Sequence, residues 1–171
     1  MQDALDCVRE FHAEMHAPIS PCPTLLACDR TAATTIAERV SDLAAEMMAA
    51  ASEDEVLLRR ASMALEELAE WLAAHAQGNL VAGADAWADR AYVLFGDAVA
   101  AGLPAVALFE EVHRSNMTKE PDPLRTGKAI KGAAYRPPDI RNALVSNSAN
   151  LTHQQVQWLQ ATSVRPSNLN L

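Results

Sequence analysis

The sequence predicts an all-α protein, a helical bundle, on three observations. Half of the 171 residues are hydrophobic but only 5% are aromatic, and alanine and leucine supply most of the apolar content. These two residues favour helices, whereas strands favour β-branched and aromatic residues. The six glycines and nine prolines cluster between segments of helical period. No internal repeat of solenoid length is present, so we expect one domain around a single core.

The first two expected helices are separated by a proline-rich break. Residues 2–17 have one apolar face at helical spacing, and residues 17–24 contain three prolines. A second helix is expected over residues 29–51, with Asp29 as its N-cap. Its expected apolar stripe consists of Ile36, Val40, Leu43 and Met47.

Two longer helices follow. The third, over residues 52–76, begins with the pattern of a capping box, in which Ser52 is the cap and Glu55 lies three residues later. The fourth, over residues 81–101, is expected to end at Gly102 and Pro104.

The last third of the chain mixes short helices with a long irregular segment. A fifth helix is expected over residues 104–117 and a last one over residues 151–161. Residues 118–140 have no sustained period, and a segment of this length in a compact domain is usually functional or disordered. Asp139 is expected to open a short helix.

Charge and cysteine content narrow the class of protein. The formal net charge is -8 and no basic stripe follows any expected helix, which argues against a nucleic-acid partner. Cys7, Cys22 and Cys28 are odd in number and lack CxxC spacing, so we expect reduced thiols in a cytoplasm. The N-terminus lacks the features of a signal peptide and no apolar run has membrane-spanning length. We therefore expect a cytoplasmic protein with no membrane partner.

Acidic residues are concentrated on two neighbouring helices. The stretch LEELAEW carries three glutamates that fit within roughly a 100° arc of a helix: Glu66, Glu67 and Glu70. On the next helix Asp85 and Asp89 lie one turn apart. Two helices with facing acids would form a site for a hard cation such as Mg²⁺, which prefers oxygen ligands. A solvated helix face accounts for the glutamates as well, and both interpretations stay open on this evidence.

Further stretches carry a family resemblance. LFEEVHRSNMTK at 108–119, GKAIKGAAYRPPDI at 127–140 and FHAEMHAP at 11–18, together with the acidic motifs, resemble the all-α nucleoside triphosphate pyrophosphohydrolase superfamily. This superfamily includes MazG proteins, phosphoribosyl-ATP pyrophosphohydrolase and dimeric dUTPases. The MazG-like branch, with dUTPase-like members and phage-type (d)GTP diphosphohydrolases, is the most similar. The resemblance covers residues 8–17 and about 55–141.

The resemblance implies a fold and an assembly. It implies a MazG-like helical bundle with a four-helix core in residues 1–141, with residues 25–51 as an inserted helix. Residues 142–171 would be a C-terminal extension that packs on a neighbouring subunit, because a polar terminal segment is ordered only when it is tied down. A homo-oligomer, either a dimer or a tetramer, is expected.

The resemblance also implies a reaction, in which a nucleoside triphosphate and water give a monophosphate and pyrophosphate. The three glutamates would be catalytic metal ligands for Mg²⁺ or Mn²⁺, and one of them would activate water. Asp89 would be the aspartate of the family's ExxD motif. The glutamate of that motif falls on Ala86, and Asp85 could replace it.

Substrate contacts follow from the same resemblance. Four side chains are expected at the phosphates and sugar: Asn116, Lys119, Lys128 and Lys131. Arg114 is a weaker candidate. A base-binding wall is expected from Phe11, His12 and Met15, with core packing as the alternative, while His16 is expected to cap a helix.

The expected substrates are dGTP or GTP first and dUTP next. The alternative, based on the change at Ala86, is a catalytically weakened MazG-like module that binds nucleotides or partners.

Overall fold

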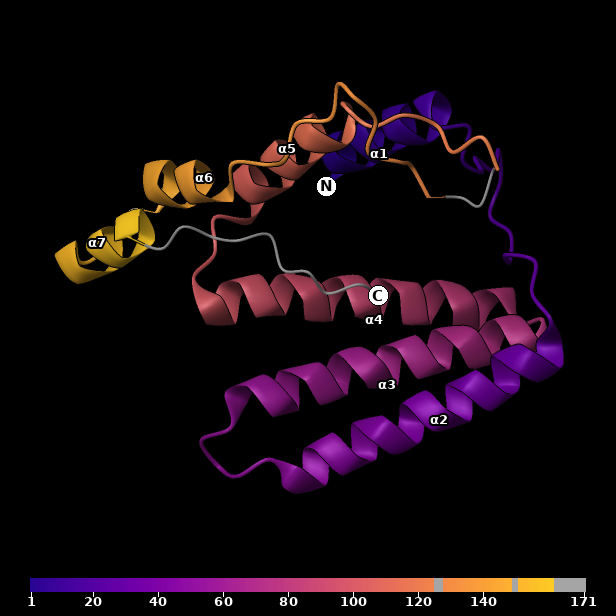
Figure 1. Cartoon of the computed structure of the whole chain (residues 1–171). Coiled ribbons are helices and arrows are strands. Elements are labelled where there is room, and N and C mark those ends of the chain that lie inside the picture. The colour runs from indigo at the N-terminus through magenta and orange to yellow at the C-terminus, as the bar shows by residue number, and fades with distance from the viewer. Residues whose placement is uncertain (125–127, 149–150, 162–171) are drawn as a thin grey trace. The chain divides into compact units, whose positions relative to one another are not determined.

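The computed structural model describes residues 1–124, 128–148 and 151–161, and within them it contains helices and no strand (Figure 1). An isolated antiparallel bridge joins Glu120 and Ile130. The all-α prediction is therefore confirmed. Among the described residues, no single helix is long and apolar enough to cross a membrane, although the consecutive helices α4 (Leu80–Ala101) and α5 (Ala105–Asn116) pass the same test when they are counted together.

The chain divides into two compact units. The three-helix unit is Ser20–Ala101, and the terminal unit combines Met1–Ile19 with Gly102–Leu171. Residues 125–127, 149–150 and 162–171 lie outside the described part, so the expected C-terminal extension, residues 142–171, lies partly outside it.

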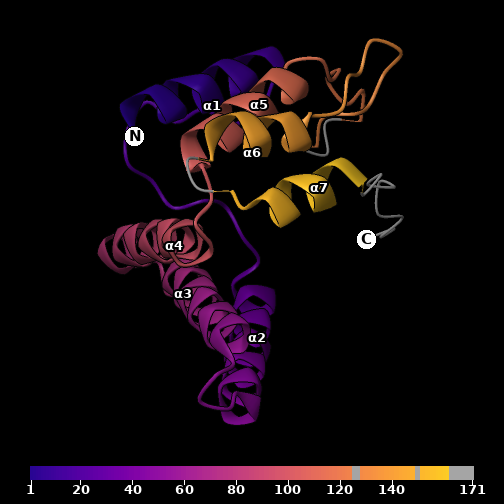
Figure 2. The ribbon, with the colours of Figure 1, turned by 90° about the vertical axis from the view of Figure 1, so that its left-hand side faces the viewer.

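The three-helix unit consists of α2 (Arg30–Ala50), α3 (Val56–Gln77) and α4 (Leu80–Ala101). Short connections make consecutive helices antiparallel, and α3 packs against both α2 and α4 (Figures 1 and 2). This arrangement places the two acidic helices of the sequence side by side.

Local signals account for most helix ends in this unit. The Asp29 carboxylate caps α2 by accepting a hydrogen bond from the Ala32 N–H at 3.0 Å, as predicted. Gly78 ends α3 in the left-handed conformation, with φ 74°. The Arg30 side chain crosses that glycine and donates to the Ala76 carbonyl at 2.5 Å, which ties the start of α2 to the end of α3.

The predicted capping box at the start of α3 is wrong. Glu55 occupies the N-cap position and makes no capping hydrogen bond with its side chain. The Arg59 guanidinium instead reaches back and donates to the carbonyls of Ser52, at 2.7 Å, and Glu53. Because these backbone acceptors come before the helix, the connection is held from inside α3 rather than by Ser52.

The core of this unit is built on alanine. The buried residues of α2 are Ala33, Ala37 and Ala44, whereas Ile36 and Leu43 from the predicted stripe are 43% and 47% exposed. The buried face is thus rotated by roughly 70° from the predicted stripe, at 100° per residue. Small side chains let α2 approach α3 closely, and that close approach displaces the larger residues to the edge of the contact.

Polar side chains strengthen both helix contacts. Ser62 of α3 is fully buried and donates to the Ala44 carbonyl of α2 at 2.8 Å. Arg60 of α3 pairs with Asp97 of α4 at 2.6 Å and donates to the Val93 carbonyl at 2.5 Å. Gly96 leaves room for that guanidinium, since a Cβ there would lie 2.5 Å from Arg60 Nη2.

The described residues of the terminal unit form four helices: α1 (Gln2–Glu14), α5 (Ala105–Asn116), α6 (Ile140–Asn147) and α7 (His153–Ala161). Helices α1 and α6 pack on α5, and α7 packs on α6 (Figure 2). The described residues between α5 and α6 are irregular apart from the bridge between Glu120 and Ile130.

The predicted cap at Asp139 is confirmed, whereas the C-cap of α1 is Met15 and His16 is the residue directly after it. Helix α1 stops at Glu14 rather than at residue 17, because His16 takes a left-handed conformation with φ 55°. The Ala17 N–H then donates to the His12 carbonyl at 2.8 Å, in a Schellman-type ending. Asp139 caps α6 by accepting from the Asn142 N–H at 3.0 Å.

Candidate active site

Five carboxylates of the three-helix unit share one electrostatic neighbourhood. Helix α3 contributes three and α4 two: Glu66, Glu67, Glu70, Asp85 and Asp89. Four of them are exposed, and Glu67 is half-buried. The facing of the two acidic helices that the sequence predicts is therefore present.

Glu67 lies at the centre of this cluster. Its Oε2 atom is buried and has no hydrogen-bond partner. Desolvation raises the pKa of its carboxyl, and the charges of the other four acids raise it further, Glu70 most and Asp89 next. A buried acceptor without a donor is costly, so this atom is suited to a bound cation or a protonated partner.

No basic side chain neutralises the cluster. In the part of the chain that the structure describes, none of the five acids forms an ion pair with a lysine or arginine. Arg90 is next to Asp89 in sequence, but its guanidinium lies 4.7 Å above the ring of Trp71. The negative charge of the cluster is therefore uncompensated.

The donor chemistry of the cluster fits a hard divalent cation, because all its donors are carboxylate oxygens and one of them is unpaired. Among the described residues, however, no three side chains are arranged as a ready-made set of metal ligands. Like charges repel without a cation between them, which is a physical reason for such spacing. The assignment of individual ligands stays a prediction.

Ala86 is 3% exposed. It lies on the side of α4 that packs on α3, between the exposed residues Asp85 and Asp89 in sequence. A longer acid at Ala86 would start inside the helix contact. Asp89 starts nearer the edge of that contact, whereas Asp85 lies roughly 130° around the helix from the buried face of Gly83 and Ala86. The replacement of the missing glutamate by Asp85 stays a prediction.

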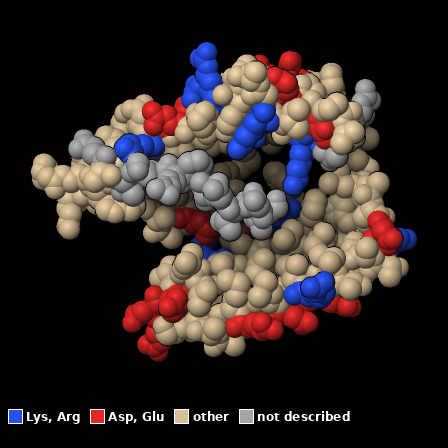
Figure 3. Space-filling model, viewed as in Figure 1, with Lys and Arg blue, Asp and Glu red and all other residues tan. Residues whose placement is uncertain are grey.

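An open groove of about 420 Å³ adjoins the cluster between α2 and α3. Glu70 lines it, together with Glu38 and Asp42 of α2. Figure 3 shows acidic side chains along α2 and at the turn into α3. A groove with this acidic lining would repel a phosphate group unless a cation lay between them.

The remaining predicted site residues all belong to the terminal unit. Phe11 of α1 and Asn116 of α5 line one small cavity of about 50 Å³, together with His113. His113 lies 3.5 Å from Glu10, so a protonated His113 would pair with that acid.

The other N-terminal candidates have local roles. His12 makes a hydrogen bond from Nδ1 to the Pro18 carbonyl at 2.8 Å, which fixes its ring against the chain after α1. Met15 is half-buried at the end of α1. Packing and base binding both remain compatible with these positions.

The basic residues predicted to bind substrate differ in whether they contact other side chains of the protein. Arg114 forms a two-pronged pair with Glu111, at 2.8 and 2.6 Å, which agrees with its lower rank. Lys131 lies over the ring of Tyr135, with Nζ 5.1 Å from the ring centroid. Lys119 is half-buried and Lys128 is exposed. Figure 3 shows several Lys and Arg side chains around α5 and the segment after it.

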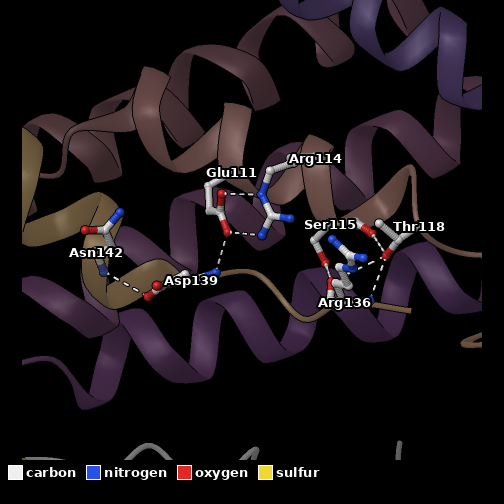
Figure 4. Close-up of polar contacts among 7 residues, drawn as sticks. All are labelled: Glu111, Arg114, Ser115, Thr118, Arg136, Asp139 and Asn142. Carbon is white, nitrogen blue, oxygen red and sulfur yellow. Dashed lines mark hydrogen bonds and ion pairs between the residues drawn. The ribbon is translucent and has the colours of Figure 1, made fainter. Parts of the chain in front are cut away.

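Sequence reasoning missed a hydrogen-bond network on α5. Glu111, Ser115 and Thr118 bind the backbone of residues 136–139 (Figure 4). The spacing of three and four residues places these polar groups on one side of the helix end, and this is the signal in the sequence. Their partners are backbone atoms, which no sequence pattern identifies.

An all-α fold with a carboxylate cluster shared by two neighbouring helices defines a class of acidic, cation-compatible helical proteins. The comparison with protein families is more specific: the family described as phosphoribosyl-ATP pyrophosphohydrolase matches residues 30–116, just over half of the chain. The chain belongs to this family, whose fold is all-α and MazG-like. No curated protein and no solved structure matches the chain.

Membership settles the general chemistry. The chain is a hydrolase that acts on phosphorus-containing anhydrides, of the nucleotide pyrophosphohydrolase kind, and its family generally depends on divalent metals. The match begins at Arg30, so it includes α2. The interpretation of residues 25–51 as an insertion stays a prediction.

Proposed function

We propose that this protein is a Mg²⁺-dependent nucleoside triphosphate diphosphohydrolase that converts a (d)NTP and water into the (d)NMP and pyrophosphate. The observation that carries the proposal is the unpaired, buried Oε2 of Glu67 within an uncompensated carboxylate cluster. Such an arrangement is costly for stability, and a functional cation explains why it is kept.

The five carboxylates have two tasks in this proposal. Glu66, Glu67, Glu70 and the two aspartates of α4 hold divalent ions, and Asp85 replaces the family glutamate missing at Ala86. Glu67 is the best placed of the three glutamates to accept a proton from the attacking water, since its Oε2 has no other partner. When bound, Mg²⁺ or Mn²⁺ neutralises phosphoryl oxygens and lowers the pKa of bound water.

Residues of the terminal unit serve the rest of the substrate. Lys119, Lys128 and Lys131 meet the phosphates, and Asn116 meets the sugar or phosphates. Phe11, in the same cavity as Asn116, supports the base together with His12 and Met15.

The proposed order of substrates is dGTP or GTP first and dUTP next. Phosphoribosyl-ATP, after which the matching family is described, is the further candidate to include. The protein acts as a homo-oligomer in the cytoplasm, with neither nucleic acid nor membrane as a partner.

Product analysis tests the reaction. The protein is incubated with Mg²⁺ and each of dGTP, GTP, dUTP and phosphoribosyl-ATP, and pyrophosphate and monophosphate are quantified. We expect equal amounts of the two products, with the highest kcat/KM for a guanine nucleotide. A clear preference for dUTP would reverse the substrate order, and no pyrophosphate from any of the four would overturn the proposal.

A pair of matched variants tests the site. Glu67→Gln keeps the size of the side chain and removes its charge, and we expect kcat to fall by about 100-fold or more, the range of general base catalysis. Glu46→Gln, an equal change on the exposed surface of α2, serves as the control. Full activity in Glu67→Gln would show that the site is assigned wrongly.

A further inference from the structure

The segment between α5 and α6 is fastened to α5 by its backbone (Figure 4). The Ser115 hydroxyl donates to the Arg136 carbonyl at 2.7 Å, and the Arg136 N–H donates to Thr118 Oγ1 at 2.8 Å. One turn earlier on α5, the Glu111 carboxylate accepts from the Asp139 N–H. The end of α5 therefore holds this segment at two points, four residues of α5 apart.

The anchor at Glu111 is itself fixed in orientation. Arg114 donates to both carboxylate oxygens of Glu111, and this fork restricts the carboxylate to one plane. Ser115, the neighbouring anchor, is 2% exposed. Asp139 also caps α6 with its side chain, so the held segment leads directly into a helix start. These contacts are connected to one another, and together they form a hydrogen-bonded framework between α5 and the segment that leads into α6.

The same framework carries two lysines at its other end. The bridge between Glu120 and Ile130 has both backbone hydrogen bonds at 2.9 Å. In an antiparallel pair the residue before one partner and the residue after the other lie at the same end, so the bridge brings the backbone of Lys119 beside that of Lys131. Within the described residues neither lysine forms an ion pair with a carboxylate.

We propose that Glu111, Ser115 and Thr118 are positioning residues that hold residues 131–139 on α5, so that Lys119 and Lys131 meet the polyphosphate of the substrate in a preset arrangement. This inference rests on the proposed function. Ordering a free backbone costs conformational entropy, so a segment that is ordered in advance binds its ligand at a lower entropic cost.

Kinetics of anchor variants test the proposal. Removing an anchor should weaken binding of substrate and transition state alike, which raises KM and leaves kcat nearly unchanged. We expect KM to rise about 3- to 10-fold in Glu111→Ala, the range of one or two lost hydrogen bonds. Glu111→Gln keeps an acceptor for the Asp139 N–H and should restore most of the loss. Glu110→Gln, the exposed neighbour on α5, is the matched control.

A double-mutant cycle distinguishes an effect of Glu111 that acts through the two lysines from an effect on the stability of the whole fold. In a Lys119→Ala, Lys131→Ala background, Glu111→Ala should change KM by less than about 2-fold, because the residues through which it acts are gone. An equal effect of Glu111→Ala in both backgrounds would overturn the proposal, as would an unchanged KM in the single variant.

Binding of inorganic tripolyphosphate keeps this test separate from the nucleotide reaction. With Mg²⁺ present, calorimetry should give weaker tripolyphosphate binding for Glu111→Ala than for Glu110→Gln. Equal affinity of the two variants would overturn the positioning role even if nucleotides are hydrolysed. Absence of nucleotide turnover would overturn the proposed function. The comparison of tripolyphosphate affinities would then still decide whether Glu111 positions the lysines.

Discussion

At the scale of single residues, the carboxylate of Glu67 lies in an energetically unfavourable environment. Its Oε2 is buried without a partner, and four further acids surround it. Residues that reduce stability in this way are typical of functional sites. Glu67 should therefore be both necessary for activity and unfavourable for the stability of the metal-free fold.

The stability of Glu67→Gln tests this residue separately from catalysis. Removing the central charge relieves repulsion, and we expect the metal-free variant to unfold a few degrees above the metal-free wild type. In the presence of Mg²⁺ this difference in unfolding temperature should become smaller or change sign, because only the wild type is fully stabilised by binding the ion. Calorimetric scans with EDTA and with Mg²⁺ measure both effects. A metal-free variant less stable than the wild type would contradict the account.

Ala86 gives a second prediction at this scale. Ala86→Glu restores the residue type of the family motif but places a charge at a position that is 3% exposed. We expect it to lower the free energy of unfolding by about 2 kcal/mol or more without raising activity. Ala84→Glu, at an exposed position of the same helix away from Val81, Tyr92 and Val99, is the control in urea unfolding. A stable and more active Ala86→Glu protein would mean that Asp85 does not replace the missing glutamate.

At the scale of elements, α5 combines packing with the hydrogen-bond framework that holds the segment after it. The Arg114 pair and the Asp139 N–H lower the pKa of Glu111 to about 2. Its carboxylate thus stays ionised over all ordinary conditions, and the anchor persists.

The pH dependence of stability follows from that shift. A carboxyl with a lowered pKa in the folded state contributes stability above its unfolded value of 4.5, and the contribution is lost as the pH falls towards about 2. Glu111→Gln lacks this contribution, so its free energy of unfolding should fall less than that of the wild type over this range. Urea unfolding at both ends of the range gives the comparison. Parallel curves for the two proteins would exclude an ionised Glu111 as an anchor.

The sequence predicts these elements well where a local signal exists. Asp29 and Asp139 are caps that their own carboxylates define, and the acids of α3 and α4 follow from helical period. Long-range contacts are different. At the start of α3, the Arg59 side chain reaches back to the Ser52 carbonyl, while the helix begins at Val56 without a side-chain cap. Likewise, alanines rather than larger residues face α3, because close helix approach is decided by the partner helix.

At the scale of the whole molecule, helix α4 carries three large exposed apolar side chains on the side away from α3. Val81, Tyr92 and Val99 lie within roughly 20° of one another around the helix, and each is about 80% exposed. An apolar stripe of this kind is usually covered in solution. We expect a second copy of the chain to cover it, in agreement with the proposed dimer or tetramer.

Light scattering tests the assembly. The wild type should have a mass of two or four times 18.4 kDa, and Val99→Glu should shift it towards smaller species, because a charge in an apolar contact is costly. A wild-type mass of a single chain at micromolar concentration would contradict the assembly.

The central claim is that the cluster on α3 and α4 is a divalent-cation site, and titration calorimetry with Mn²⁺ tests it most directly. The account predicts saturable binding to the wild type, retained in Glu46→Gln and strongly weakened in Glu67→Gln. Binding that is absent in the wild type, or equal in all three proteins, would contradict it.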